Sequence, residues 1–146
     1  MNEQRSRSPE QLREELLHAA RQVRNNAYVP YSGFKVGVAI RLAGNGELVS
    51  GCNVENVSYG ATVCAERNAV FTALGRYGVN AVKGQIEELL LVTDADPPAV
   101  PCALCLQVLQ EFAGPRLPIH IADLTGIRRT TTLGEMLPQP FSSFER

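Results

Sequence analysis

The sequence lacks any segment that approaches the roughly 20 consecutive apolar residues of a membrane-spanning helix. Its N-terminus, MNEQRSRSPEQ, is polar and has no apolar stretch ahead of a cleavage site, so it is not typical of a secretory signal. We therefore expect a cytoplasmic protein with no membrane partner. Disulfides are rare in that compartment, so the 4 cysteines point to metal binding or catalysis.

An excess of basic charge is also missing. The chain has 14 Lys and Arg residues against 15 Asp and Glu residues, for a formal net charge of -1. The densest basic clusters, Arg21 with Arg24 and Arg128 with Arg129, are more typical of solvated faces than of a phosphate track. Phosphate contacts supply most of the affinity in nucleic-acid binding, so the charge balance predicts no nucleic-acid partner.

Internal repeats, low-complexity segments and linkers are absent as well. With 146 residues, of which 45% are hydrophobic and 20% charged, the chain has the size and composition of one globular domain. We expect a single catalytic domain over residues 1–146, in which the polar residues 1–7 are flexible.

Periodicity and turn residues predict an α/β fold. Ser8-Pro9-Glu10-Gln11 is typical of a helix start, and apolar residues at helical spacing extend that helix to about Asn26. Two strands followed by helix, strand, helix and strand predict a mixed five-stranded sheet with helices on both faces, a three-layer α/β/α arrangement. The expected strands cover 36–42, 47–53, 86–93, 117–122 and 130–133, and the other helices cover 63–77 and 101–114, with one helical turn near 135–138.

Three cysteines lie where two of these helices are expected to begin. Cys64 precedes Ala65 and Glu66, and PCALC places Cys102 and Cys105 at the start of the later helix. A helix N-terminus stabilises negative charge and lowers the pKa of a thiol, and the thiolate is the form that binds metal. Three protein ligands leave the fourth tetrahedral position of Zn²⁺ open to water, so the pattern predicts a catalytic zinc site.

Glu66 follows the first predicted ligand by two residues, close enough to reach a zinc-bound water without binding the metal. Zinc lowers the pKa of that water, and Glu66 would move its proton to the substrate. A ligand followed by x-Glu, with Pro-Cys-x-x-Cys downstream, is the arrangement of zinc-dependent deaminases.

Two other interpretations compete with a catalytic zinc. A structural four-cysteine site would have to recruit Cys52, whose distance from Cys64 in the sequence is not that of a zinc knuckle. A redox Cys-x-x-Cys formed by Cys102 and Cys105 would leave Cys64 without a role. Both leave Glu66 unexplained. Cys52 is more typical of a small buried hydrophobic residue, and we expect His18 and His120 to be structural.

From Tyr28 to Phe141, the motifs resemble those of the small homotetrameric cytidine deaminases. The resemblance runs through VPYSGFKVGVAI, GCNVENVSYGATVCAERNAV, PCALC and LGEMLPQPF, and the second block is the most specific. It implies the cytidine deaminase-like fold and a homotetramer.

The resemblance also implies roles for individual residues. Arg67 would donate to the thiolate sulfurs and offset the negative charge of three thiolates around one zinc ion. Phe141 would reach into the site of a neighbouring subunit. The remaining roles are zinc ligation by Cys64, Cys102 and Cys105, proton transfer by Glu66, contacts with the ribose hydroxyls by Asn53 and Glu55, packing on the pyrimidine by Phe34, a place in the pocket loop for Tyr59, and contact with the base edge by Ala65.

The implied reaction is the hydrolytic deamination of cytidine and deoxycytidine to uridine and deoxyuridine in pyrimidine salvage, with zinc-bound hydroxide attacking C4. Two residues depart from the family pattern: Ala103 stands in place of Gly, and Leu106 in place of Arg. Loss of that Arg leaves open a deaminase of a modified nucleoside or of an antibiotic such as blasticidin S. A polynucleotide editor and a catalytically impaired zinc-binding module are further alternatives. The first is disfavoured by the charge balance, the second by the intact Glu66.

Overall fold

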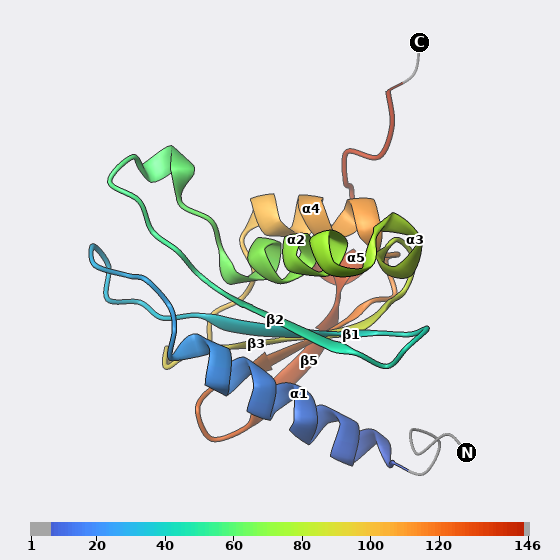
Figure 1. Ribbon diagram of the computed structural model, residues 1–146, viewed down its shortest axis with the longest axis horizontal. Coiled ribbons are helices and arrows are strands. Elements are labelled where there is room, and N and C mark those ends of the chain that lie inside the picture. The colour runs from blue at the N-terminus through green and yellow to red at the C-terminus, as the bar shows by residue number, and fades with distance from the viewer. Residues whose placement is uncertain (1–6, 145–146) are drawn as a thin grey trace.

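The computed structural model describes residues 7–144, which build one five-stranded sheet with helices on both faces (Figure 1). The strand order is β2-β1-β3-β4-β5. In chain order, the elements are α1 (Pro9–Arg24), β1 (Gly37–Leu42), β2 (Leu48–Cys52), the 3₁₀ turn η2 (Tyr59–Ala61), α2 (Ala65–Tyr77), α3 (Val79–Val82), β3 (Ile86–Val92), α4 (Ala103–Phe112), β4 (Pro118–Ala122), β5 (Ile127–Thr132) and α5 (Leu133–Met136).

The sheet is mixed, as predicted. β1 pairs antiparallel with both β2 and β3, and β5 pairs antiparallel with β4. β3 and β4 are parallel, and α4 is the crossover between them. In such a layout the loops at the carboxyl end of β3 and at the start of α4 share one edge of the sheet, and that edge is where the predicted site residues collect.

α1 covers one face of the sheet, and α2 to α5 lie on the other (Figure 1). Leu16, Leu17 and Ala20 of α1 pack on strand residues that include Ala39 and Leu90. The opposite core is larger and joins α2 and α4 to the sheet. Gly51 allows α2 to approach β2 closely, because a Cβ atom there would lie 2.4 Å from the Ala69 nitrogen.

α1 begins as the sequence predicts. The Ser8 hydroxyl accepts a hydrogen bond from the Gln11 N–H, the Gln11 side-chain oxygen accepts one from the Ser8 N–H, and Pro9 occupies the first helical position. The flexibility predicted for residues 1–7 lies outside the described residues except at Arg7. Arg7 is held by an ion pair with Glu15, in which Nη1 and Oε1 lie 2.6 Å apart.

Several boundaries differ from the sequence prediction. α2 and α4 begin at Ala65 and Ala103 rather than near 63 and 101, because Cys64 and Cys102 are their N-caps. β5 is longer than expected, and the exposed Arg128 and Arg129 obscure its pattern in the sequence. The final helical turn starts at Leu133, where a capping box between Thr132 and Glu135 fixes it. α3 and η2 were not predicted.

His120 lies in a buried polar network that crosses the sheet. Its Nε2 lies 2.7 Å from Glu88 Oε2 on β3, and its Nδ1 lies 2.8 Å from the Thr130 hydroxyl on β5. Arg41 on β1 bonds the other oxygen of Glu88 at 3.4 Å. Among residues 7–144, no helix has the length and hydrophobicity needed to cross a bilayer.

Candidate active site

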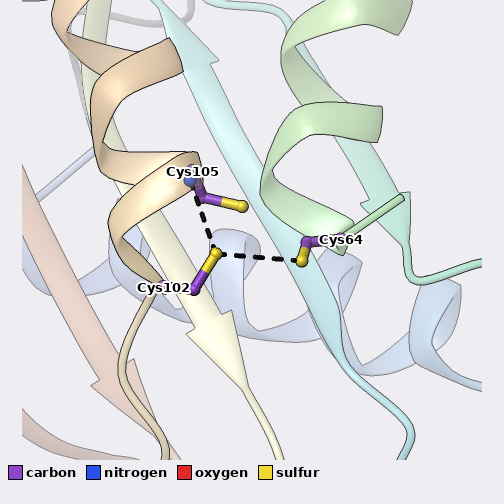
Figure 2. A group of neighbouring side chains, drawn as sticks. All are labelled: Cys64, Cys102 and Cys105. Carbon is purple, nitrogen blue, oxygen red and sulfur yellow. Dashed lines mark hydrogen bonds between the residues drawn. The ribbon is translucent and has the colours of Figure 1, made fainter. Parts of the chain in front are cut away.

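Three thiols meet where α2 and α4 begin. Cys64 caps α2, Cys102 caps α4, and Cys105 lies on the first turn of α4. Their sulfur atoms lie within 4.8 Å of one another, and those of Cys64 and Cys102 are 4.0 Å apart. Figure 2 shows the three side chains converging from the two helix starts.

The thiol cluster fits a zinc ion. Zn–S bonds of about 2.3 Å in tetrahedral geometry place sulfur atoms about 3.8 Å apart, which is close to the observed separation. Among the described residues, this is the one group of three metal-binding side chains whose ligand atoms lie this close together. Three thiolates at such distances repel one another strongly, so a cation between them is needed for all three to ionise.

The environments of the thiols differ. The neighbouring Cys105 thiol, together with the Arg67 guanidinium, lowers the pKa of Cys64 to about 5. Proximity to Cys64 and burial raise the pKa of Cys105. Cys102 accepts a hydrogen bond from the Cys105 N–H at 3.4 Å, as expected of a helix N-cap. Without a metal ion, negative charge is thus favoured on the Cys64 sulfur and disfavoured on the Cys105 sulfur.

Arg67 contacts the cluster directly. Its Nη2 donates to the Cys64 sulfur at 3.5 Å, and the side chain is only partly buried. The observed contact with the thiolate, which also raises the pKa of Arg67, favours the charge-offsetting arrangement.

Glu66 is buried between the thiols and the cavity described below. Its side chain is 4% exposed, and Oε2 accepts a hydrogen bond from the Cys105 thiol at 3.6 Å. Burial raises the pKa of Glu66 to about 6, and the negative charge of Cys64 adds to this effect. A carboxyl group with a pKa near neutrality can both accept and release a proton, as general acid–base catalysis requires.

A cavity of about 210 Å³ opens beside the thiols. Six of the predicted site residues line it: Phe34, Asn53, Cys64, Ala65, Glu66 and Cys102. Sequence reasoning missed the remaining lining residues, which are Val36, Thr62, Leu91, Thr93, Ala99 and Val100. Thr93 could have been predicted from the sequence, because it is the polar residue directly after the apolar run of β3, and ligands of such folds bind at the carboxyl ends of strands.

Of the residues predicted to contact the substrate, Glu55, Tyr59 and Phe141 lie outside the lining of this cavity. The Glu55 carboxylate accepts hydrogen bonds from the N–H groups of Tyr31 and Ser32. Tyr59 is 78% exposed and packs edge-to-face on Tyr31, with ring centroids 6.2 Å apart. Phe141 is 61% exposed and is tied to α4.

The substitutions in the predicted ligand segment do not disturb the thiols. Leu106 is 5% exposed and belongs to the core beneath α4. Ala103 is the first residue of α4 and lies on its exposed surface. The position that carries a charged Arg in the resembled family is thus filled here by a core aliphatic side chain.

Comparisons with known proteins agree with this geometry. Residues 10–121 match the family model for the cytidine and deoxycytidylate deaminase zinc-binding region. The chain is 41% identical over 129 residues to a cytidine deaminase of Sporosarcina psychrophila, covering 88% of this chain and 90% of the relative. It is 43% identical over 122 residues to the cytidine deaminase of Mycobacterium tuberculosis, covering 84% of each chain.

Solved structures give the same result. The crystal structure of cytidine deaminase from Burkholderia pseudomallei matches with a TM-score of 0.80 and 38% identity, covering 88% of this chain and 98% of that one. The cytidine deaminase from Mycobacterium tuberculosis matches with a TM-score of 0.71 and 40% identity, covering 89% and 97%. The chain therefore belongs to the zinc-dependent cytidine and deoxycytidylate deaminase family.

Proposed function

We propose that this protein hydrolyses cytidine and deoxycytidine to uridine and deoxyuridine, releasing ammonia, as an enzyme of pyrimidine salvage. The observation that carries the proposal is the buried Glu66 carboxyl, which borders both the cavity and the three-thiol cluster. Relatives that cover most of the chain are named as cytidine deaminases, which supports cytidine as the substrate.

Cys64, Cys102 and Cys105 would hold the zinc ion, which supplies a Lewis acid that makes water a usable nucleophile near neutral pH. Glu66 accepts a proton from the attacking water and delivers it to ring nitrogen N3. The remaining proton of that water passes from the oxygen now bonded to C4 to the amino group, the C4–N bond breaks as C4=O forms, and one water molecule thus replaces one ammonia. The raised pKa of Glu66 suits a group that must take up and release protons within one turnover.

The cavity residues hold the nucleoside in this proposal. Phe34 packs on the pyrimidine ring, while the Cys64 N–H and the Ala65 carbonyl hold the polar edge of the base. Asn53 and Glu55 contact the ribose hydroxyls. Arg67 keeps its bond to the Cys64 thiolate and so reduces the negative charge of the ligand set.

The assembly and location belong to the proposal too. We propose one catalytic domain per chain and a homotetramer in which Phe141 enters a neighbouring site, with Tyr59 near the same subunit boundary. Both rings are more than half exposed in the single chain, which supports burial against another subunit. A cytoplasmic location suits four free cysteines, three of which must stay reduced to bind zinc.

The test is to purify the protein, quantify its zinc, and follow the ultraviolet change on addition of cytidine. Glu66→Gln should abolish turnover while zinc remains bound, because the amide cannot carry the proton. Glu111→Gln is the matched control, since Glu111 lies on the exposed surface of α4, away from the thiols.

Two results would contradict the proposal at different levels. A folded protein without zinc would remove the metal site, and with it the mechanism. Stoichiometric zinc without turnover of cytidine or deoxycytidine would leave the metal site but reject the substrate. Modified nucleosides and blasticidin S would then be compared in the same assay.

A further inference from the structure

The segment of residues 31–36 carries Phe34 to the cavity. The segment lies between Tyr28, which forms an isolated β-bridge with Val54, and strand β1. It has no regular secondary structure and turns at Gly33, whose φ is 69°. Backbone groups in such a segment lack the partners that a helix or strand supplies. Most of those partners here are side chains, from the segment itself, from the residues that follow β2 and from Arg24 of α1, which donates to the Lys35 carbonyl. The Gly33 N–H and the Val36 carbonyl pair with backbone groups.

Ser32 is at the centre of these contacts. Its hydroxyl accepts a hydrogen bond from the Phe34 N–H at 3.0 Å. Its backbone N–H donates to Glu55 Oε1 at 3.1 Å, and the Tyr31 N–H donates to the same oxygen at the same distance. Hydrogen bonding from Ser32 is the main reason that the pKa of Glu55 lies below its usual value, and the Tyr31 N–H adds to it.

Asn53 fixes the other half of the segment. Its Oδ1 accepts from the Val36 N–H at 2.9 Å, and its Nδ2 donates to the Phe34 carbonyl at 2.8 Å. The N–H of Phe34 is thus held by Ser32 and its carbonyl by Asn53. Both peptide groups that flank the Phe34 side chain are fixed by side-chain hydrogen bonds.

The residues that supply these contacts, 53–55, are also bonded to the backbone next to the thiol cluster. Val54, between Asn53 and Glu55, exchanges two backbone hydrogen bonds of 3.0 Å with Val63. Val63 immediately precedes Cys64. Residues 53–55 therefore hold two neighbours: the side chains of Asn53 and Glu55 bond the Phe34 segment, and the backbone of Val54 bonds Val63, the residue before Cys64.

We propose that Ser32 is a positioning residue: its backbone N–H is held by the Glu55 carboxylate, and its hydroxyl accepts from the Phe34 N–H and so holds the Phe34 ring at the cavity where the base binds. The inference rests on the proposed function, since that function places a pyrimidine against Phe34. Asn53 and Glu55 act with Ser32 in this arrangement, in addition to any contact that they make with the ribose.

A positioning role predicts a specific kinetic effect. Ser32 contacts neither the thiols nor Glu66, so removal of its hydroxyl leaves the reacting groups in place. The Phe34 ring would instead sample more orientations, and ordering it would weaken substrate binding. The KM should change and kcat should not.

The experiment compares Ser32→Ala and Ser32→Thr with the zinc-loaded wild-type enzyme. We expect Ser32→Ala to raise the KM for cytidine about 3- to 10-fold, the size of effect that one neutral hydrogen bond carries, with kcat within about twofold of the wild type. Ser32→Thr keeps the hydroxyl and should restore the KM. Asn45→Ala is the matched control, because Asn45 makes the same type of bond to a backbone N–H two residues on, in the turn between β1 and β2.

Amide hydrogen exchange supplies a readout that needs no turnover. Ser32→Ala should speed exchange at the Val36 N–H, which Ser32 does not contact, because a looser segment also loosens the bond to Asn53. The Asn45 variant should leave exchange there unchanged. Wild-type protein inactive on cytidine would reject the proposed substrate, whereas faster exchange at Val36 would still support Ser32 as the brace of the segment.

Two outcomes would overturn the inference. One is a Ser32→Ala variant whose KM and Val36 exchange both equal those of the wild type. The other is a loss of kcat at unchanged KM, which would place Ser32 in the chemistry rather than in positioning.

Discussion

Two residues at the start of α2 have pKa values shifted in opposite directions. Cys64 stands at the N-cap of α2, where its contacts with Cys105 and Arg67 lower its pKa to about 5. Glu66, two residues later, turns into the interior, where burial raises its pKa to about 6. One helix start therefore carries both a ligand for the metal and a carboxyl group that exchanges protons, and Cys105 of α4 helps to ionise the first.

Arg67 extends this arrangement by placing a positive charge on the Cys64 sulfur. We expect Arg67→Ala to lower kcat about 10- to 100-fold, the usual effect of removing a residue that supports a metal ligand. The physical reason is that an uncompensated set of three thiolates makes the zinc ion a weaker Lewis acid. Steady-state kinetics, together with the zinc content of the same preparation, measure the effect.

Arg67→Lys separates charge from geometry at this position. A lysine keeps the positive charge but lacks the planar fork of donors, so we expect partial recovery of kcat. Wild-type kcat in the alanine variant, at full zinc content, would mean that Arg67 does not tune the metal site.

The sequence predicts the residues of this cluster well because helix starts and short spacings determine them. The start of α2 carries Cys64 and Glu66, and the start of α4 carries Cys102 and Cys105, so the short spacing within each helix start places each pair. Glu55 is harder to predict, since its hydrogen bonds to the 31–36 segment depend on the path of a loop. That path is fixed by long-range pairing, which a local pattern does not encode.

At the scale of elements, the position of α2 depends on its contact with β2. The Asn68 side chain donates to the Cys52 carbonyl at 2.7 Å, next to Gly51, where the helix approaches the strand. Sequence periodicity identified both elements but not how closely they pack, because glycine in a strand is compatible with several local structures.

We expect Gly51→Ala to destabilise the protein by about 1–3 kcal/mol, the usual cost of overpacking. A Cβ there would lie 2.4 Å from the Ala69 nitrogen and 2.8 Å from the Ala65 carbonyl oxygen, and both atoms are backbone. Relief requires α2 to move away from the sheet, and Cys64 and Glu66 would move with it. Urea unfolding of the zinc-loaded protein measures the change in the free energy of unfolding.

Gly75→Ala provides the comparison within α2 itself. A Cβ at Gly75 meets nothing within 4 Å, and alanine is the better helix former, so we expect stabilisation of about 0.5–1 kcal/mol. If both variants shifted stability by the same amount and sign, the close packing of α2 on β2 would not be what restricts residue 51 to glycine.

At the scale of the whole molecule, the cavity is bordered by elements of one chain, and Phe141 is not among its lining residues. The Gln107 side chain of α4 holds the Phe141 backbone by two hydrogen bonds, one to the carbonyl at 2.7 Å and one from the N–H at 3.2 Å. The ring itself is left exposed, with Phe144 packed against it at a centroid distance of 5.0 Å. A fixed backbone with an exposed ring is the form expected of a residue that contacts another subunit.

This arrangement predicts complementation between two impaired variants. Phe141→Ala should raise the KM, and Glu66→Gln should abolish turnover, when each is prepared alone. In mixed oligomers made by co-expression, an intact Glu66 site can receive Phe141 from a neighbouring subunit that carries Glu66→Gln. Some sites should then regain a KM close to that of the wild type, and the fraction of such sites follows the mixing ratio.

The mass and a control variant complete this prediction. Sedimentation should give about four times the 15.9 kDa chain mass for each variant, because one ring contributes only part of an interface. Phe144→Ala should leave the KM unchanged, since the proposal gives that ring no place in a neighbouring site. Mixed oligomers of normal mass whose active sites keep the high KM of Phe141→Ala would show that each site uses its own subunit alone. A monomeric wild-type protein would exclude the shared site altogether, and the cavity of the single chain would then have to bind the nucleoside without the Phe141 ring.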